Sequence, residues 1–151
     1  MDELSISSIL SQDYLCNRIY IGTFASNNFL PITNVFPAAY IINTDISGQA
    51  GSHWYVIYIT KTCQQFRADI FDSLGAKVSK IGANIKMSLY GMSLSCNKHI
   101  YQSKTSSSCG LFCIFYIKMR SRGLTNLQVL QLLSSHDYEK NEKTISKYAY
   151  V

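Results

Sequence analysis

Four side chains in this sequence have the types and the spacing that thiol-based hydrolysis of a carbonyl compound requires. Cys109 stands in the first turn of a predicted helix, where free backbone N–H groups and the helix dipole favour a thiolate. His53 is the candidate base, Asp72 the group that would orient it, and Gln102 a donor toward an oxyanion. The free backbone N–H of Cys109 is a second such donor.

The residues around Cys109 predict a buried helix that begins at this cysteine. Serines at Ser106–Ser108 occupy the expected N-cap region, the run Cys109–Ile117 is apolar, and Gly123 follows as a C-terminal stop. We expect Gly110 to leave open space beside the sulfur, so that a substrate backbone can approach closely. In the alternative interpretation, Cys109 is one more small buried apolar residue.

A predicted β-hairpin brings the candidate base and the candidate acid together. Residues 53–60 are mostly aromatic or β-branched and predict a central strand, and residues 66–71 predict a second strand after a short turn. Because the start of one antiparallel strand neighbours the end of its partner, His53 and Asp72 are expected to meet. Taken singly, they could be a polar strand-end histidine and an ordinary turn residue.

The remaining patterns predict a mixture of helices and strands. Gln102 ends a predicted strand at 98–102, and taken alone it could be an ordinary surface glutamine. The last fifteen residues, from Asp137, are polar and predict either a short packed element or a loose tail. Periodicity and turn signals further predict strands at 19–24 and 38–42 and helices at 4–10, 78–90 and 125–133.

Length and composition indicate a single globular domain over residues 1–151, with 47% hydrophobic and 15% charged residues. The longest apolar run has nine residues, too few to span a bilayer, and the N-terminus does not resemble a secretory signal. An odd number of cysteines, five, without C-x-x-C spacing argues against a disulfide framework and against structural zinc. We therefore expect an intracellular protein with no metal site and no membrane partner.

Three blocks of this sequence resemble the active-site blocks of the adenovirus protease (adenain) family, which belongs to the superfamily of ubiquitin-like-protein proteases. The resemblance covers roughly residues 14–117. The order of the three blocks is a specific signal of the family, whereas a single Cys-Gly pair would not be. The blocks are Gly51–Trp54, Phe71–Gly75, and Gln102 followed after six residues by Cys109–Cys113.

The resemblance implies an α+β fold of the papain-like or adenain-like type. A central mixed β-sheet would carry the histidine and the acid, and a buried helix would carry the nucleophile at its N-terminus. The resemblance also implies a cysteine endopeptidase of a virus or virus-like element that processes capsid or core precursor proteins without a cofactor. Such a protein would work in the host nucleus or in the virion and would not be secreted.

The family's functional positions coincide with the residues already singled out. Adenain proper has glutamate as its acidic member, whereas Asp72 stands here, as is usual in the wider superfamily. The matches are Cys109 as nucleophile, His53 as base, Asp72 as acidic orienter and Gln102 as oxyanion donor; Trp54, Gly51 and Gly110 are predicted to form the substrate and oxyanion region.

The resemblance also implies two activators, a peptide and DNA. In adenain a short viral peptide adds a strand and forms a disulfide; Cys96 is the nearest match here, with a structural buried thiol as the alternative. A net charge of +5 permits non-specific phosphate contacts with DNA. The candidate cations are Lys77, Lys80, Lys86, Lys118, Arg120 and Arg122.

Two other functions remain open from the sequence. A deconjugating isopeptidase acting on a ubiquitin-like protein would use identical chemistry, although the small size argues mildly against it. A non-catalytic nucleic-acid-binding or structural relative would keep the fold alone, but the intact His-Asp-Gln-Cys set counts against this reading.

Overall fold

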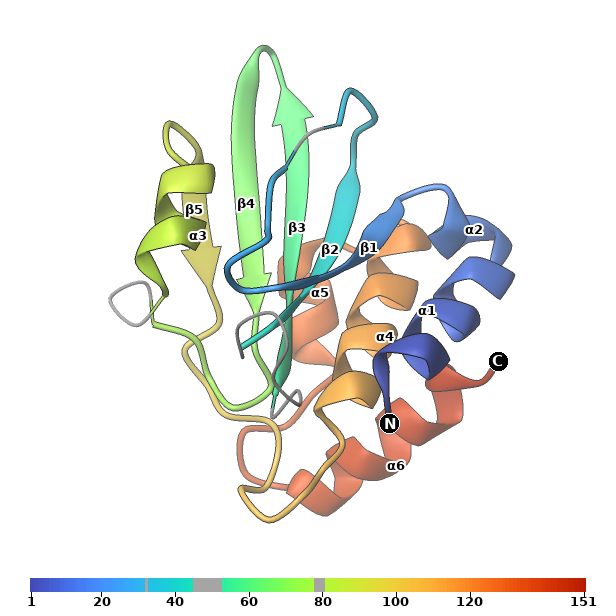
Figure 1. Cartoon of the computed structure of the whole chain (residues 1–151). Helices are drawn as coiled ribbons and strands as arrows, with labels where there is room; N and C mark the ends of the chain where they lie inside the picture. The colour runs from blue at the N-terminus through green and yellow to red at the C-terminus, as the bar shows by residue number, and fades with distance from the viewer. Residues whose placement is uncertain (32, 45–52, 78–80) are drawn as a thin grey trace.

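A mixed five-stranded sheet runs through the middle of the molecule, with helices on both of its faces (Figure 1). The computed structural model describes residues 1–31, 33–44, 53–77 and 81–151, and no helix in these ranges is long and apolar enough to cross a membrane. The elements are α1 (Glu3–Gln12), α2 (Tyr14–Asn17), β1 (Tyr20–Ala25), β2 (Ala38–Asn43), β3 (Trp54–Thr62), β4 (Gln65–Phe71), α3 (Ala83–Ser88), β5 (Ser93–Cys96), α4 (Cys109–Ser121), α5 (Asn126–Gln131) and α6 (Tyr138–Ala149).

The strands follow one another across the sheet in chain order, β1-β2-β3-β4-β5. β2, β3 and β4 are antiparallel, whereas β1 pairs with β2 and β5 with β4 in parallel, so the sheet is mixed as predicted. In the predicted hairpin Val56 of β3 lies opposite Phe71 of β4. The residues just before β3 and just after β4 therefore lie at the same end of these two neighbouring strands, which is the lower end in Figure 1.

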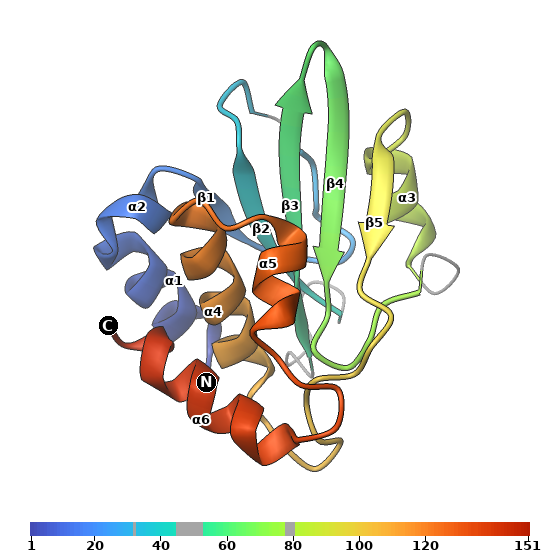
Figure 2. The same ribbon diagram turned by 180° about the vertical axis from the view of Figure 1, so that it is seen from behind.

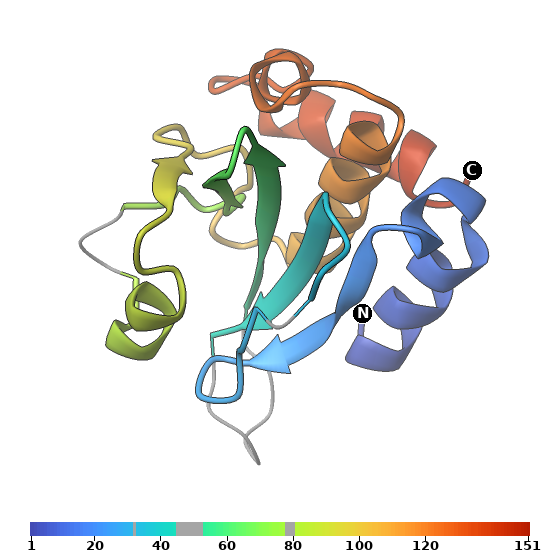
Figure 3. The ribbon, with the colours of Figure 1, turned by 90° about the horizontal axis from the view of Figure 1, so that it is seen from above.

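The two faces of the sheet bury two separate apolar clusters. Along β2, Ala39 and Ile41 point to the cluster that contains α4, whereas Tyr40 and Ile42 point to the cluster that contains Ile85 of α3. Seen from above, α3 lies on one side of the sheet and α1, α4 and α6 on the other (Figure 3). Because both faces are covered, β2 and the first part of β3 are apolar on both faces. β4 differs, because polar Gln65, Arg67 and Asp69 alternate there with apolar residues.

Helix α4 is the central helix of the larger layer, and it begins at Cys109. It buries ten of its 13 residues, as the apolar run predicts, and it packs against β3, α1 and α6 (Figure 2). Ser108 is the N-cap residue, but its side chain makes no capping hydrogen bond. The α+β fold with a buried helix that carries a cysteine at its N-terminus is thus confirmed.

Two segments differ from what periodicity predicts. The predicted strand at 98–102 is wrong: the fifth strand lies earlier, at β5, because its parallel pairing with β4 uses Ser93–Cys96. The helix predicted over 78–90 is shorter, since α3 covers Ala83–Ser88, and residues 78–80 lie outside the described part.

The polar C-terminal segment forms a packed helix, α6, which lies against α4. Its buried residues, Asn141, Ile145 and Ala149, recur every four positions and so form one narrow stripe along the helix. Composition obscured this stripe because most of the other residues of the helix are charged or polar.

Candidate active site

The start of β3, the end of β4 and the N-terminus of α4 converge, and they bring three predicted site residues together. His53 Nε2 lies 2.6 Å from Asp72 Oδ1, and the two side chains are 15% and 18% exposed. The His53 ring also interacts electrostatically with the Cys109 side chain. Because Nε2 is occupied by Asp72, Nδ1 is the ring nitrogen left for the sulfur. The three side chains therefore interact in the order Asp72, His53, Cys109.

These contacts favour a thiolate beside an imidazolium. Burial opposes ionisation of Cys109, but hydrogen bonds from the His53 ring and from the backbone N–H of Trp54 outweigh it and lower the pKa of the thiol. Burial likewise disfavours the charged form of His53, but its bonds to Asp72 and Cys109 raise the pKa of the ring to about 9. Both shifts favour a negative sulfur beside a positive ring.

Asp72 is held by backbone and side-chain contacts that the sequence did not reveal. Its backbone N–H donates to Asn97 Oδ1 at 2.8 Å, and Asn97 Nδ2 donates to the carbonyl of Asp72 at 2.7 Å. The N–H of Leu74 donates to Asp72 Oδ1 at 2.9 Å. Asn97 follows β5, where an asparagine ordinarily indicates a turn, so no sequence signal distinguished it.

Gln102 is buried but lies in no strand, contrary to the prediction from the sequence. Hydrogen bonds of its side chain and backbone hold it instead. Its Oε1 accepts from Ser73 Oγ at 2.6 Å, and its Nε2 donates to the carbonyl of Ser106 at 2.8 Å. The backbone N–H groups of Tyr101 and Gln102 both donate to the carbonyl of Ser73. A primary amide nitrogen carries two hydrogens, so the bond to Ser106 is compatible with donating the second to a substrate oxygen.

Trp54 and Gly110 both lie beside Cys109, with different consequences. Trp54 is half-buried against the α4 core, and its indole Nε1 is buried without a hydrogen-bond partner among the described residues. At Gly110 a Cβ would lie 3.1 Å from Cδ1 of Ile6, because α1 packs against this turn. The open approach beside the Cys109 sulfur stays a prediction. Gly51 lies outside the described residues.

The predicted activator residues lie at several separate places. Cys96, at the end of β5, is half-buried, and burial raises the pKa of its thiol. It lines an open cavity of about 590 Å³ together with His99 and Leu127. Among the candidate cations, Lys77 and Lys86 are exposed and Lys80 lies outside the described residues.

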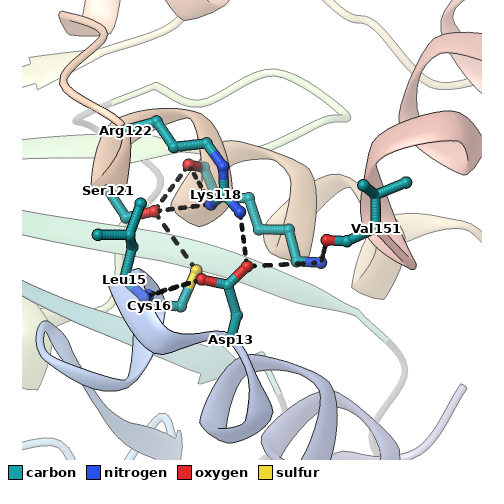
Figure 4. Close-up of polar contacts among 7 residues, drawn as sticks. All are labelled: Asp13, Leu15, Cys16, Lys118, Ser121, Arg122 and Val151. Carbon is teal, nitrogen blue, oxygen red and sulfur yellow. Dashed lines mark hydrogen bonds and ion pairs between the residues drawn. The ribbon is translucent and has the colours of Figure 1, made fainter.

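The cations of α4 do not form a phosphate-binding surface. Lys118 Nζ is buried, 3.8 Å from Asp13 Oδ2 and 2.8 Å from the carbonyl of Val151 (Figure 4). The Arg120 guanidinium is also buried and bonds Asp69 at 2.9 Å. The prediction that Lys118 and Arg120 are available to DNA is therefore wrong, because apparent surface charges are paired inside the protein.

The described residues also hold no group of three or more histidine, cysteine, aspartate or glutamate side chains that could bind a metal ion.

Residues 28–150 match the family described as the Ulp1 protease family, C-terminal catalytic domain. The chain belongs to this family. It is also 30% identical over 145 residues to the protease of bovine adenovirus 7, covering 84% of this chain and 70% of that protein. Membership of this family of cysteine proteases confirms the resemblance that the three sequence blocks indicate.

Two crystal structures of the ASFV protease are also similar to this chain. They have TM-scores of 0.48 and 0.47 and are 15% and 18% identical to it, over 74% and 72% of its length. The matched part is 43% and 41% of the crystallised ASFV chains, so this chain spans less than half of that protease.

Proposed function

We propose that this chain is a cysteine endopeptidase of a virus or virus-like element that cleaves capsid or core precursor proteins. The observation that carries the proposal is the His53 ring, hydrogen-bonded to Asp72 and interacting with Cys109 at the start of a buried helix. The similarity to the protease of bovine adenovirus 7 supports the viral setting, and with it action inside the host cell or the virion. Its substrates are proteins, as membership of a protease family implies.

In the first half of the proposed reaction, the thiolate of Cys109 attacks the carbonyl carbon of the scissile peptide bond and forms a C–S bond. The carbonyl oxygen becomes an oxyanion that accepts from the backbone N–H of Cys109 and from the Gln102 amide. His53 then gives its Nδ1 proton to the peptide nitrogen, the C–N bond breaks, and the amine leaves.

In the second half, the now neutral His53 takes a proton from water as the water oxygen attacks the thioester carbon. The same two donors stabilise the second oxyanion. The C–S bond breaks, the acid product leaves, and the thiolate–imidazolium pair is restored. Asp72 keeps the ring oriented throughout, through the 2.6 Å contact with Nε2.

The family match itself favours a second candidate, an isopeptidase that removes a ubiquitin-like protein from its targets. Its chemistry at Cys109 would be identical, so only the substrate distinguishes the two functions. The viral relative favours the endopeptidase.

Two measurements test the proposal. A thiol-directed active-site probe should label Cys109 in the native chain and should fail to label a Cys109→Ala variant. Precursor-derived peptides and ubiquitin-like conjugates should then be offered in parallel. We expect cleavage of the peptides; hydrolysis of the conjugates alone would favour the isopeptidase, and no labelling at Cys109 would contradict both.

Activation by a peptide is a further part of the proposal, with the half-buried thiol of Cys96 as the attachment point. Activity should rise when cysteine-containing peptides from capsid proteins are added, and Cys96→Ser should abolish that rise. Full activity of the chain alone, unchanged by Cys96→Ser, would contradict this part of the proposal.

Activation by DNA is proposed through the exposed Lys77 and Lys86, since the cations at the end of α4 are paired. Titration of labelled duplex DNA at increasing salt tests this, because phosphate contacts weaken steeply as salt rises. Binding that is indifferent to salt, or absent at low salt, would contradict it.

A further inference from the structure

The loop of residues 102–108, here called the oxyanion loop, joins the two proposed oxyanion donors. Gln102 begins it, and the backbone N–H of Cys109 follows its last residue. Residues 103–108 form no helix or strand, so no regular hydrogen-bond ladder holds their conformation. A few local hydrogen bonds, such as Ser106 N–H to the carbonyl of Ser103, hold the loop from within. The separation and direction of the two donors depend in addition on contacts that other parts of the chain make with this loop.

Glu142 of α6 makes two of those contacts. Its Oε1 accepts from Ser106 Oγ at 2.6 Å, and its Oε2 accepts from Ser108 Oγ at 2.7 Å. Hydrogen bonds to an ionised carboxylate at such distances are among the stronger ones in proteins. Because the carbonyl of Ser106 in turn accepts from Gln102 Nε2, Glu142 is one residue removed from the proposed oxyanion donor.

The neighbouring residue of α6 holds the other end of the loop. The buried Asn141 side chain donates from Nδ2 to the carbonyl of Tyr101 at 2.9 Å, just before Gln102. It also donates to the carbonyl of Ser134 and accepts from the backbone N–H of Ser134. Figures 1 and 2 show the loop passing beside the first turns of α6. Two consecutive side chains thus hold the loop from one helix.

The Ser108 hydroxyl gives up an ordinary local role to bond Glu142. Ser108 is the N-cap residue of α4, yet its hydroxyl donates a hydrogen bond to Glu142 and makes no capping bond to its own helix. A side chain that caps its own helix would leave the loop free to move relative to α6. The observed arrangement ties the loop to a second helix.

We infer that Glu142 is a positioning residue for the proposed reaction: through Ser106 and Ser108 it holds the oxyanion loop so that the Gln102 amide and the Cys109 N–H point at one oxygen. The inference rests on the proposed function. Glu142 touches no reacting atom, and its effect is exerted through Gln102.

The first test compares Glu142→Ala with Glu139→Ala, a matched change on the same helix. Glu139 is exposed, and among the described residues its one ion pair is with Lys143 of the same helix. Loss of the Glu142 carboxylate should lower kcat for peptide cleavage by about 10- to 100-fold, because a small displacement of an oxyanion donor weakens the stabilisation of the transition state. KM should stay within about threefold. Glu142→Gln, which keeps the shape and one acceptor, should recover part of the loss, and Glu139→Ala should cleave like the unchanged chain.

A double-mutant cycle separates positioning from general stability. In a Gln102→Ala background, Glu142→Ala should cause little further loss of kcat, since the donor that it positions is gone. Equal losses in both backgrounds would overturn the inference. Low-pH alkylation of Cys109 should be unchanged by Glu142→Ala, because the thiolate depends on His53. Slow alkylation of the unchanged chain would count against the proposed function instead.

Hydrogen exchange gives a readout that needs no activity. The amides of residues 103–108 should exchange faster in Glu142→Ala than in Glu139→Ala, while those in the middle of α4 should keep their protection. Unchanged exchange in the loop would overturn the inference, as would exchange that accelerates equally throughout α4.

Discussion

The two ends of helix α4 both carry buried charge, but the charge has different chemistry at each end. At the N-terminal end, Cys109 faces His53, whose side chain is 15% exposed. At the C-terminal end, Lys118 and Arg122 surround Asp13, whose side chain is 8% exposed (Figure 4). The signs follow the helix dipole, with the anion at the first turn and the cations at the last.

The difference lies in which groups can exchange protons near neutral pH. A thiol and an imidazole can lose or gain a proton under mild conditions, whereas lysine and arginine side chains keep theirs. The N-terminal pair can therefore do acid–base and nucleophilic chemistry, and the C-terminal cluster can only hold segments together. The cluster joins α4 to the turn between α1 and α2 and to the end of the described chain.

The largest effect is expected at the nucleophile. Cys109→Ala should lower kcat for peptide cleavage by about 10⁶-fold, to background. Iodoacetamide at mildly acidic pH should modify Cys109 first among the five cysteines, while Cys113, whose pKa burial raises, stays protected one turn deeper. Modification of Cys109 no faster than that of Cys16 or Cys63 would contradict the chemical contrast between the two ends of α4.

The next effect is expected at the base. His53→Ala should suppress both peptide cleavage and the low-pH alkylation of Cys109, because the hydrogen bond that lowers the pKa of the thiol is lost. In the unchanged protein, cleavage should fall as pH rises through about 9, where the imidazolium loses the proton that it gives to the leaving amine. A pH–rate profile and a pH series of alkylation measure both effects. Low-pH alkylation that survives His53→Ala would contradict this account.

A smaller loss is expected at the acid. Asp72→Asn removes a charge but keeps the shape of the side chain, so cleavage should fall by about 10²- to 10⁴-fold and should remain measurable. Because hydrogen bonding and charge from Asp72 help to raise the pKa of His53, the alkaline limb of the pH–rate profile should move to lower pH. If the alkaline limb of the pH–rate profile stays unchanged, Asp72 does not raise the pKa of the His53 ring.

The C-terminal cluster should respond in stability and leave the chemistry intact. Asp13→Asn leaves the buried Lys118 without its carboxylate, so the free energy of unfolding should fall by about 3 kcal/mol. Glu139→Gln, in an exposed pair, should cost about 1 kcal/mol or less. Urea denaturation measures both changes. Low-pH alkylation of Cys109 should be unaffected; a parallel loss of alkylation would show that the two ends of α4 are coupled.

The same cluster predicts an acid-dependent loss of stability. Burial opposes ionisation of Asp13, but bonds from Arg122 and from the N–H of Cys16 outweigh it and lower the pKa of the carboxyl to about 2. A lowered pKa means that the stabilisation is present above the ordinary carboxyl pKa of about 4 and is lost as pH falls toward 2. Asp13→Asn should remove this part of the acid dependence. If the stability of the unchanged protein and that of Asp13→Asn depend on acid pH in the same way, the role assigned to Asp13 is contradicted.

Local patterns in the sequence were enough to predict the parts of the site that lie on strong secondary structure. The aromatic and β-branched run predicts β3, the short turn predicts an antiparallel partner, and together they place His53 beside Asp72. The apolar run predicts the buried α4 with Cys109 in its first turn. Each of these inferences depends on neighbours in sequence or on a single hairpin, where register follows from the turn.

Contacts between distant segments escaped the sequence. The packing of Ile6 against Gly110, the pairing of Lys118 with Asp13, and the bonds of Glu142 to the oxyanion loop all join residues far apart in the chain. Residue type alone does not say whether a lysine is solvated or paired, or whether a serine caps its own helix or bonds another. The sequence by itself determined which groups could do chemistry and on which elements they lie. Beyond the contact that the hairpin predicts, only the tertiary structure decided which of those groups are in contact, because burial and partners depend on how the elements pack.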